Sequence, residues 1–278
     1  MTIAVVGGTG MVGRRLVAGL RVDGHDVVVV ARSCGIDTVT GMGLAEALDG
    51  VDIVIDVSSP GYAAADDMRA FFDASCCNLL EAERSAGVAH HIALSAVGTD
   101  RLGTTGYFRA KLLQERLVAA SAIPFTILRS TPFYEYLYGI VDLGGDGKCL
   151  HLAPSLMQPI AVNDVVAELQ RIASEQPANT VIEIAGPDVR RLDRFAEDIL
   201  GANEDPRDIV VSPETPYFGA RMQDEALVVS WGSRKSSIRF DDWLRESIVV
   251  SSTTEIPQRP VDMAFSSARR SARLDGAG

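Results

Sequence analysis

Short apolar runs alternate with helical patterns along the first 185 residues of the chain. Continuous runs rich in β-branched residues are typical of strands buried on both faces of a parallel sheet, and they stand at 2–6, 27–31, 51–57 and 90–94. Apolar residues recur at helical spacing between them, as in 11–20 and 67–86. The alternation predicts an α/β fold, a doubly wound parallel sheet with helices on both faces. We also expect a short third strand at 36–40.

The first run leads directly into a cluster of glycines, Gly7-Gly8-Thr9-Gly10-Met11-Val12-Gly13, at the start of the next helical pattern. In this setting Gly7 and Gly8 allow a tight turn, Gly10 lets the backbone approach a pyrophosphate, and Gly13 lets the helix pack close to the strand. The N–H groups and dipole of the helix N-terminus then face the phosphates. The stretch therefore predicts a dinucleotide-binding Rossmann fold.

The end of the second strand indicates which dinucleotide is bound. An NAD site usually carries an acid there, at bonding distance from the ribose hydroxyls. Here the strand ends in Ala31-Arg32-Ser33, and Asp26 lies at its opposite end. A guanidinium at Arg32 can bind a 2′-phosphate in bidentate fashion, and Ser33 can add a hydrogen bond. We therefore expect NADP, with NADPH preferred over NADH.

A candidate catalytic set follows the later strands. Ser95 ends the run at 90–94, and Tyr107 and Lys111 stand four residues apart on one face of a predicted helix after a glycine-rich loop, 98–106. A free tyrosine has a pKa of about 10 and exchanges protons poorly at neutral pH. We expect the Lys111 ammonium to lower the pKa of Tyr107, and the Ser95 hydroxyl to hold a substrate oxygen.

These motifs together resemble the short-chain dehydrogenase/reductase superfamily, in its atypical, NmrA-like branch. The resemblance spans about the first 185 residues. It is carried by the opening Val-Val-Gly-Gly-Thr-Gly-Met-Val-Gly, Ala31-Arg32-Ser33, Ser95-Ala-Val-Gly98, Tyr107-Phe-Arg-Ala-Lys111, the stretch from Ile123 to Phe133, and Gln158-Pro-Ile-Ala-Val-Asn-Asp-Val165.

The resemblance implies that Tyr107 is the acid–base residue, Lys111 its helper and Ser95 the substrate-oxygen contact. It also implies that Thr131-Pro132-Phe133, after the sixth expected strand, borders the nicotinamide. The residues expected to bind the cofactor are Gly7, Thr9, Gly10, Met11, Val12, Gly13, Arg32, Ser33, Val57, Ser58, Ser59, Lys111, Thr131, Pro132 and Phe133.

An aromatic run, Phe133-Tyr134-Glu135-Tyr136-Leu137-Tyr138, follows the last of these strands. Its rings fit a pocket for a flat aromatic substrate as well as they fit packing in the core, since pockets are themselves mostly apolar and aromatic. The expected substrate-pocket residues are Ser95, Val97, Tyr107, Phe133, Tyr134 and Tyr138. We expect a dinucleotide-binding domain over 1–185, with 133–160 contributing to the substrate pocket. A smaller substrate lobe is expected over 186–250 and a flexible tail over 251–278, where apolar periodicity ends.

Composition narrows the class of protein. The 278-residue chain has a net charge of −11, which argues against nucleic-acid binding, and its four cysteines show no metal-ligand spacing, so no metal is expected. No signal segment or membrane-length apolar run is visible, so we expect a cytoplasmic protein that does not bind membranes. Whether the chain forms a homodimer is left open by the sequence.

The sequence thus favours an NADPH-dependent reductase of a small carbonyl, enone, quinone or imine compound. An NADP(H)-sensing regulator without turnover and an epimerase or isomerase that uses bound nucleotide stay open as alternatives.

Overall fold

The main feature of the computed structural model is a twisted, wholly parallel sheet. The structure describes residues 1–60, 64–103, 106–143, 148–215, 217, 225–229 and 232–253, except the side chains of 138, 140–143 and 248–253. In this part of the chain the sheet has the strand order β11-β8-β5-β4-β3-β1-β2. Its strands are β1 (Thr2–Val6), β2 (Asp26–Val30), β3 (Ile53–Asp56), β4 (His90–Ala96), β5 (Phe125–Ser130), β8 (Thr180–Ala185) and β11 (Arg234–Lys235).

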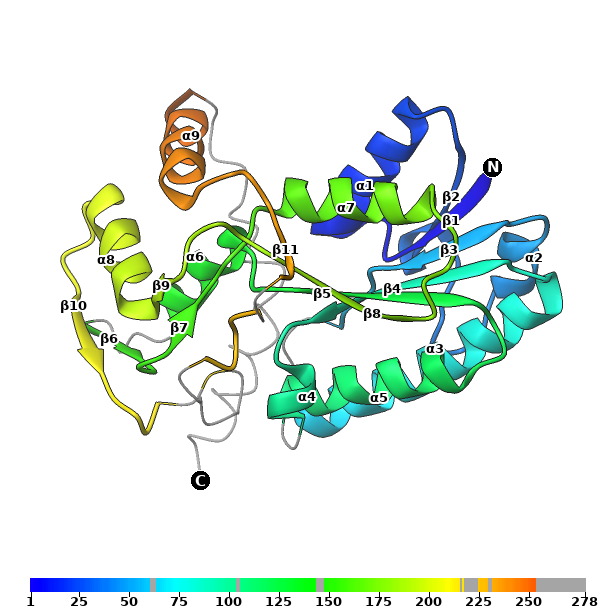
Figure 1. Ribbon diagram of the computed structural model, residues 1–278, viewed down its shortest axis with the longest axis horizontal. Coiled ribbons are helices and arrows are strands. Elements are labelled where there is room, and N and C mark those ends of the chain that lie inside the picture. The colour runs from blue at the N-terminus through cyan, green and yellow to red at the C-terminus, as the bar shows by residue number, and fades with distance from the viewer. Residues whose placement is uncertain are drawn as a thin grey trace.

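Helices cover both faces of this sheet (Figure 1). One face carries α1 (Met11–Val22) and α7 (Val162–Ala173), and the other carries α2 (Leu44–Leu48), α3 (Ala65–Ala86) and α5 (Gly106–Ala120). The apolar stripe of α1, including Leu16 and Leu20, is fully buried against β1 and α7. Burial of such stripes is what fixes each amphipathic helix to its face of the sheet. The doubly wound Rossmann fold predicted from the alternation is confirmed.

Two loops differ from expectation. The expected strand at 36–40 is wrong, because Asp37 makes only an isolated antiparallel bridge to Met42. Its carboxylate accepts a hydrogen bond from the Val39 N–H, and this local turn competes with strand pairing. The strand before Thr131 is therefore the fifth along the chain. Within the glycine-rich loop 98–106, a short helix forms, α4 (Thr99–Leu102).

A smaller lobe lies beside the carboxyl ends of the strands (Figure 1). It contains α6 (Tyr134–Leu143), β6 (Cys149–Leu152), β7 (Leu156–Met157), β9 (Arg190–Arg191), α8 (Leu192–Ala202), β10 (Asp208–Val211) and α9 (Phe240–Thr253). Its core joins residues from 134–157 to residues from 192–244, so the lobe begins before residue 186. Conversely, β11 belongs to the large sheet.

The C-terminal part of the chain is only partly described. Helix α9 extends to Thr253, three residues into the segment that was expected to be a tail, and residues 254–278 lie outside the described residues. No helix among the described residues is both long enough and apolar enough to span a bilayer.

Candidate dinucleotide and substrate cleft

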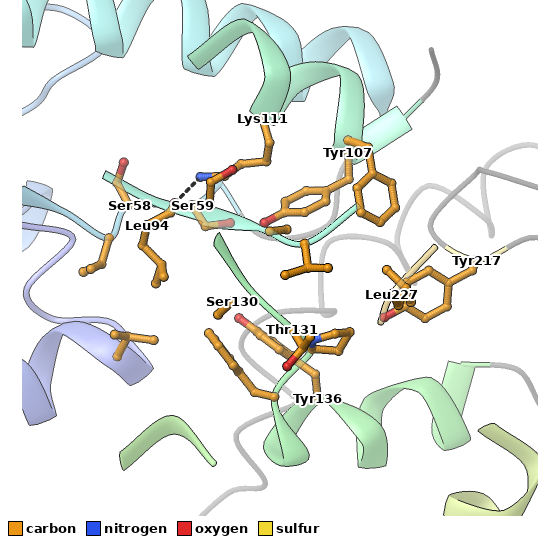
Figure 2. Close-up of a pocket in the computed structure, with 18 residues that line it drawn as sticks. Ser58, Ser59, Leu94, Tyr107, Lys111, Ser130, Thr131, Tyr136, Tyr217 and Leu227 are labelled. Atoms are coloured by element: carbon orange, nitrogen blue, oxygen red, sulfur yellow. Dashed lines mark hydrogen bonds between the residues drawn. The ribbon is translucent and has the colours of Figure 1, made fainter. Parts of the chain in front are cut away.

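A cleft opens where the carboxyl ends of β3, β4 and β5 meet the smaller lobe, beside the start of α1 (Figure 2). Its empty volume, with the open mouth included, is about 990 Å³. The lining residues are Val12, Val57, Ser58, Ser59, Leu94, Ser95, Ala96, Val97, Tyr107, Phe108, Lys111, Ser130, Thr131, Pro132, Phe133, Tyr136, Tyr217 and Leu227. Ligands of open α/β sheets bind at this edge.

The glycine loop has the backbone geometry that a pyrophosphate requires. Gly7 has φ +78°, and a Cβ on it would lie 2.9 Å from the Ser58 Cα. A Cβ on Gly13 would lie 2.2 Å from the Gly7 carbonyl oxygen, so only glycine lets α1 start this close to the strand. Gly10 is the N-cap of α1 and has no side chain to cap it. The N–H groups of the first turn, which have no partner within the helix, are therefore left to a ligand.

A buried hydroxyl in the lining of the cleft, that of Thr131, also fits a bound group. Thr131 is 1% exposed, and its Oγ1 has no hydrogen-bond partner in the described part of the chain. Buried polar atoms without a partner are rare in folded proteins, and a ligand is one common explanation. Together with the open helix terminus, this hydroxyl means that the residues present fit a dinucleotide.

The expected cofactor residues fall into three groups. Those lining the cleft are Val12, Val57, Ser58, Ser59, Lys111, Thr131, Pro132 and Phe133. Those in the loop and first turn beneath it are Gly7, Thr9, Gly10, Met11 and Gly13. Arg32 and Ser33 lie in a short 3-10 helix, η1 (Arg32–Cys34), directly after β2; both are exposed and do not line the cleft.

Three tyrosines surround the reacting end of the cleft. Tyr107 comes from α5 and Tyr136 from α6 on the opposite side, while Tyr217 lies toward the smaller lobe (Figure 2). Burial raises the pKa of Tyr107 well above its ordinary value, and Tyr136 and Glu115 add to the rise. Burial likewise raises the pKa of Tyr136, with Glu135 adding to it. Burial also raises the pKa of Tyr217, and Tyr107 adds to it. All three hydroxyls are therefore protonated at neutral pH.

This finding corrects the expectation for Tyr107, whose pKa is raised rather than lowered. The main cause is burial of the phenol, and Lys111 directs its ammonium elsewhere. Lys111 Nζ donates to the Leu94 carbonyl oxygen at 2.7 Å and to Gln114 Oε1 at 2.5 Å. The Gln114 amide in turn donates to Asp56 Oδ2 at 2.7 Å. Burial lowers the pKa of Lys111 to about 8, although Asp56 and Glu115 oppose the shift.

Ser95 is also engaged differently from the expectation. Its hydroxyl donates to Glu115 Oε1 at 2.5 Å, and the Arg129 guanidinium holds the same carboxylate through hydrogen bonds of 2.9 and 2.7 Å. Ser95 lines the cleft, but its proton is directed into this buried ion pair. Tyr107 and Thr131 are among the other hydroxyls that line the cleft and could donate to a substrate oxygen.

The structure separates the expected substrate-pocket residues. Ser95, Val97, Tyr107 and Phe133 line the cleft. Tyr134 does not: it is fully buried in the smaller lobe, where its hydroxyl donates to the Ile238 carbonyl oxygen. The side chain of Tyr138 lies outside the described residues.

The cleft also includes Phe108, Tyr136, Tyr217 and Leu227, which were not expected there. Tyr136 stacks on Phe133 with ring centroids 5.4 Å apart. The spacing of three residues between them indicates that the two rings share a face, and this spacing could have placed Tyr136 in the cleft beside Phe133. Tyr217 and Leu227 come from distant sequence, and no local pattern indicates their position.

No group of three or more His, Cys, Asp or Glu residues that could hold a metal ion occurs within the described ranges. His91 instead forms a fully buried pair with Glu83 (2.8 Å). The polar side chains that line the cleft among the described residues carry hydroxyls and the ammonium of Lys111.

Comparison with known proteins agrees with this site. A sequence family described as NAD(P)H-binding matches residues 7–136. A divinyl chlorophyllide a 8-vinyl-reductase of Zea mays is 30% identical over 227 residues, which cover 67% of this chain and 55% of that protein. The photosystem II assembly factor Ycf39 of Synechocystis sp. is 28% identical over 153 residues, covering 50% and 47%. The chain spans about half the length of these curated relatives.

Solved structures share the fold at low sequence identity. A UDP-glucose 4-epimerase from Bifidobacterium longum, in complex with NAD+ and UDP, superposes with a TM-score of 0.67 at 14% identity and covers 91% of this chain and 99% of that one. A dTDP-4-dehydrorhamnose reductase from Clostridium acetobutylicum gives 0.68 at 14% identity, covering 90% and 100%. The glycine loop, the cleft, the matched family and these relatives lead to one conclusion: the chain is an NAD(P)-binding Rossmann protein of the atypical short-chain dehydrogenase/reductase superfamily, in its NmrA-like branch.

Proposed function

We propose that the protein is an NADPH-dependent reductase of a small, uncharged, unsaturated compound, with Tyr107 as the proton donor. The compound is a carbonyl, enone, quinone or imine. The observation that carries the proposal is the position of the Tyr107 hydroxyl in a largely apolar cleft that Val12, at the start of α1, also lines.

Reduction of such a compound adds a hydride to one atom and a proton to its partner atom. The reduced dinucleotide supplies the hydride when bound. Tyr107 donates its hydroxyl proton to the developing negative charge, and the resulting phenolate regains a proton from solvent. The raised pKa keeps Tyr107 protonated at neutral pH but also makes it a weaker acid, so its proton passes to the strongly basic centre that develops as the hydride arrives. Because Thr131 Oγ1 has no partner among the described residues, it is available as a second donor in the cleft.

The lining of the cleft supports an uncharged substrate. Among the described residues that line the cleft, Lys111 is the one lysine, arginine or carboxylate residue, and its ammonium is turned toward Leu94 and Gln114. An anionic or strongly polar substrate would lose its hydration here without a compensating partner. The Zea mays relative is named as a reductase of a vinyl group, which supports reduction of a conjugated double bond within the proposed class.

We propose NADPH over NADH because Arg32 and Ser33 directly follow β2, where the 2′-substituent of a bound dinucleotide is read. Arg32 forms no ion pair with any carboxylate of the described residues, so its guanidinium is available for a phosphate. The Rossmann helix terminus beneath the pyrophosphate serves either dinucleotide.

The test is NADPH oxidation with a panel of uncharged conjugated carbonyl and alkene compounds, using the wild type, Tyr107→Phe and Tyr134→Phe. Tyr134 is the matched control, since its hydroxyl lies in the lobe core rather than in the cleft. We expect Tyr107→Phe to bind NADPH normally and to lose about 100-fold or more in kcat. Tyr134→Phe keeps kcat within a few fold. Equal kcat values in the two variants would overturn the role of Tyr107.

A second candidate function is an NADP(H)-responsive regulator, favoured by the engagement of Ser95 with Glu115 rather than with the cleft. The name of the Synechocystis relative, an assembly factor, supports this candidate. A regulator would bind NADPH without consuming it in the presence of any compound of the panel, and the reductase would consume it in stoichiometric amounts with product.

A further inference from the structure

A second cavity lies on the opposite side of the large sheet from α1, between α3 and α5, which run side by side there (Figure 1). Its empty volume is about 560 Å³ with the mouth included, and it shares no lining residue with the dinucleotide cleft. The lining residues are Arg69, Gly103, Arg109, Leu112, Leu113 and Arg116. Half of this lining is therefore arginine, in a chain of net charge −11.

Geometry brings the three guanidinium groups to one place. Arg109 and Arg116 are seven residues apart on α5, which is two helical turns, so they lie on the same face. Leu112 and Leu113, both partly buried, lie between them along the helix and contribute an apolar wall. Arg69 reaches the cavity from α3. All three arginines are exposed, so the cavity is accessible to solutes.

These arginines also lack the partners that arginines have elsewhere in the molecule. Arg84 pairs with Glu81, and Arg171 with Glu168. By contrast, no hydrogen bond or ion pair joins Arg69, Arg109 or Arg116 to any of the described residues. Helix α3 carries Asp66, Asp67 and Asp73, and none of them lies within ion-pair distance of these guanidiniums.

Three guanidinium groups that line one cavity without an ion-pair partner among the described residues can each pair with a bound anion. A guanidinium matches phosphate oxygens through two parallel N–H donors, which makes arginine clusters selective for phosphate. The leucine wall can contact an organic group attached to the phosphate.

We propose that Arg69, Arg109 and Arg116 form a binding site for a small organic phosphate, distinct from the dinucleotide cleft. This site is independent of the proposed reductase function.

The test uses phenyl phosphate as the probe, with phenol as its uncharged reference, in isothermal titration calorimetry on protein with saturating NADP+ at about 0.15 M NaCl. The variants are Arg116→Gln, Arg116→Lys and Arg21→Gln. Arg21 is the matched control, because it is an exposed arginine at the end of α1 that also has no ion-pair partner among the described residues.

We expect the wild type to bind phenyl phosphate more tightly than phenol. Arg116→Gln weakens that binding about tenfold, Arg116→Lys recovers part of the loss, and Arg21→Gln stays within about twofold of the wild type. Equal binding by Arg116→Gln and Arg21→Gln would overturn the proposal, and so would equal affinity for phenyl phosphate and phenol. If the protein does not bind NADP+, the comparison between variants still holds, since both retain the same glycine loop.

Discussion

Neutralising the buried ammonium of Lys111 by raising the pH should stabilise the fold. Lys111 is 3% exposed, and burial lowers its pKa from 10.5 to about 8. Between these two values the unfolded chain carries a proton on Lys111 and the folded chain does not. Stability rises with pH wherever the unfolded state binds more protons. The contribution of Lys111 to the free energy of unfolding is therefore least favourable below pH 8 and improves as the pH rises toward 10.5.

The magnitude follows from the size of the shift. Each pKa unit corresponds to about 1.4 kcal/mol, so the lowering of the pKa from 10.5 to about 8 amounts to about 3 kcal/mol. Other groups also titrate in this range, so the prediction concerns the difference between the wild type and Lys111→Met. Lys111→Met also loses the hydrogen bonds to Leu94 and Gln114. That loss lowers the stability of the variant at every pH, so the prediction concerns how the difference between the two proteins changes with pH.

The assay is urea unfolding of both proteins at several pH values from 7 to 10, followed by tryptophan fluorescence. We expect the stability of the wild type relative to Lys111→Met to increase by about 2.5 kcal/mol between pH 7 and 10. A difference that stays constant or decreases as the pH rises would refute the reasoning that burial lowers the pKa of Lys111.

Three other predictions follow from single contacts. Arg32→Ala should reduce the preference for NADPH over NADH by about tenfold or more in binding titrations; an unchanged ratio would contradict the assignment of Arg32 to the 2′-phosphate. Glu115→Ala should lower the free energy of unfolding in urea by about 3 kcal/mol, the lower end for a broken buried pair, because Arg129 loses its tightest carboxylate but keeps Asp100 at 3.2 Å and Glu183 at 3.9 Å; a loss below about 1 kcal/mol would argue against a tight buried pair. Burial acts to lower the pKa of His91, but Glu83 outweighs it and the pKa is raised. The stability advantage over His91→Gln is therefore full below pH 6.5 and should decrease as the pH rises, by calorimetric Tm; an advantage that grows with pH would contradict this pairing.

The sequence predicts the sheet and the glycine loop well because both depend on local signals. The β-branched runs at β1 and β2 and the helical spacing of α1 each specify their own element and its burial. The position of Tyr107 and Lys111 on α5 also follows from spacing alone, and both line the cleft.

What could not be predicted depends on contacts between distant residues. Tyr134 lies in the lobe core because its hydroxyl reaches the Ile238 carbonyl, 104 residues away. The pKa of Tyr107 depends on how deeply the cleft buries it and on where Lys111 finds acceptors, and neither can be read from a spacing of four residues. In the same way, Glu115 accepts the hydrogen bond of the Ser95 hydroxyl because Arg129 fixes that carboxylate from β5.

The central claim is that a dinucleotide binds at the N-terminus of α1, and Gly10→Asp tests it most directly. Gly10 has φ −76° and ψ −178°, which aspartate adopts easily, and a Cβ there would lie 3.2 Å from the Gly7 oxygen, which demands only a small shift. Aspartate is a good N-cap, so the variant should fold and keep its Tm. Its carboxylate would occupy the N–H groups of the first turn and repel the pyrophosphate. In NADPH fluorescence titrations we expect the wild type to bind and Gly10→Asp to lose about 100-fold or more in affinity. Equal affinity in the two folded proteins would contradict the account.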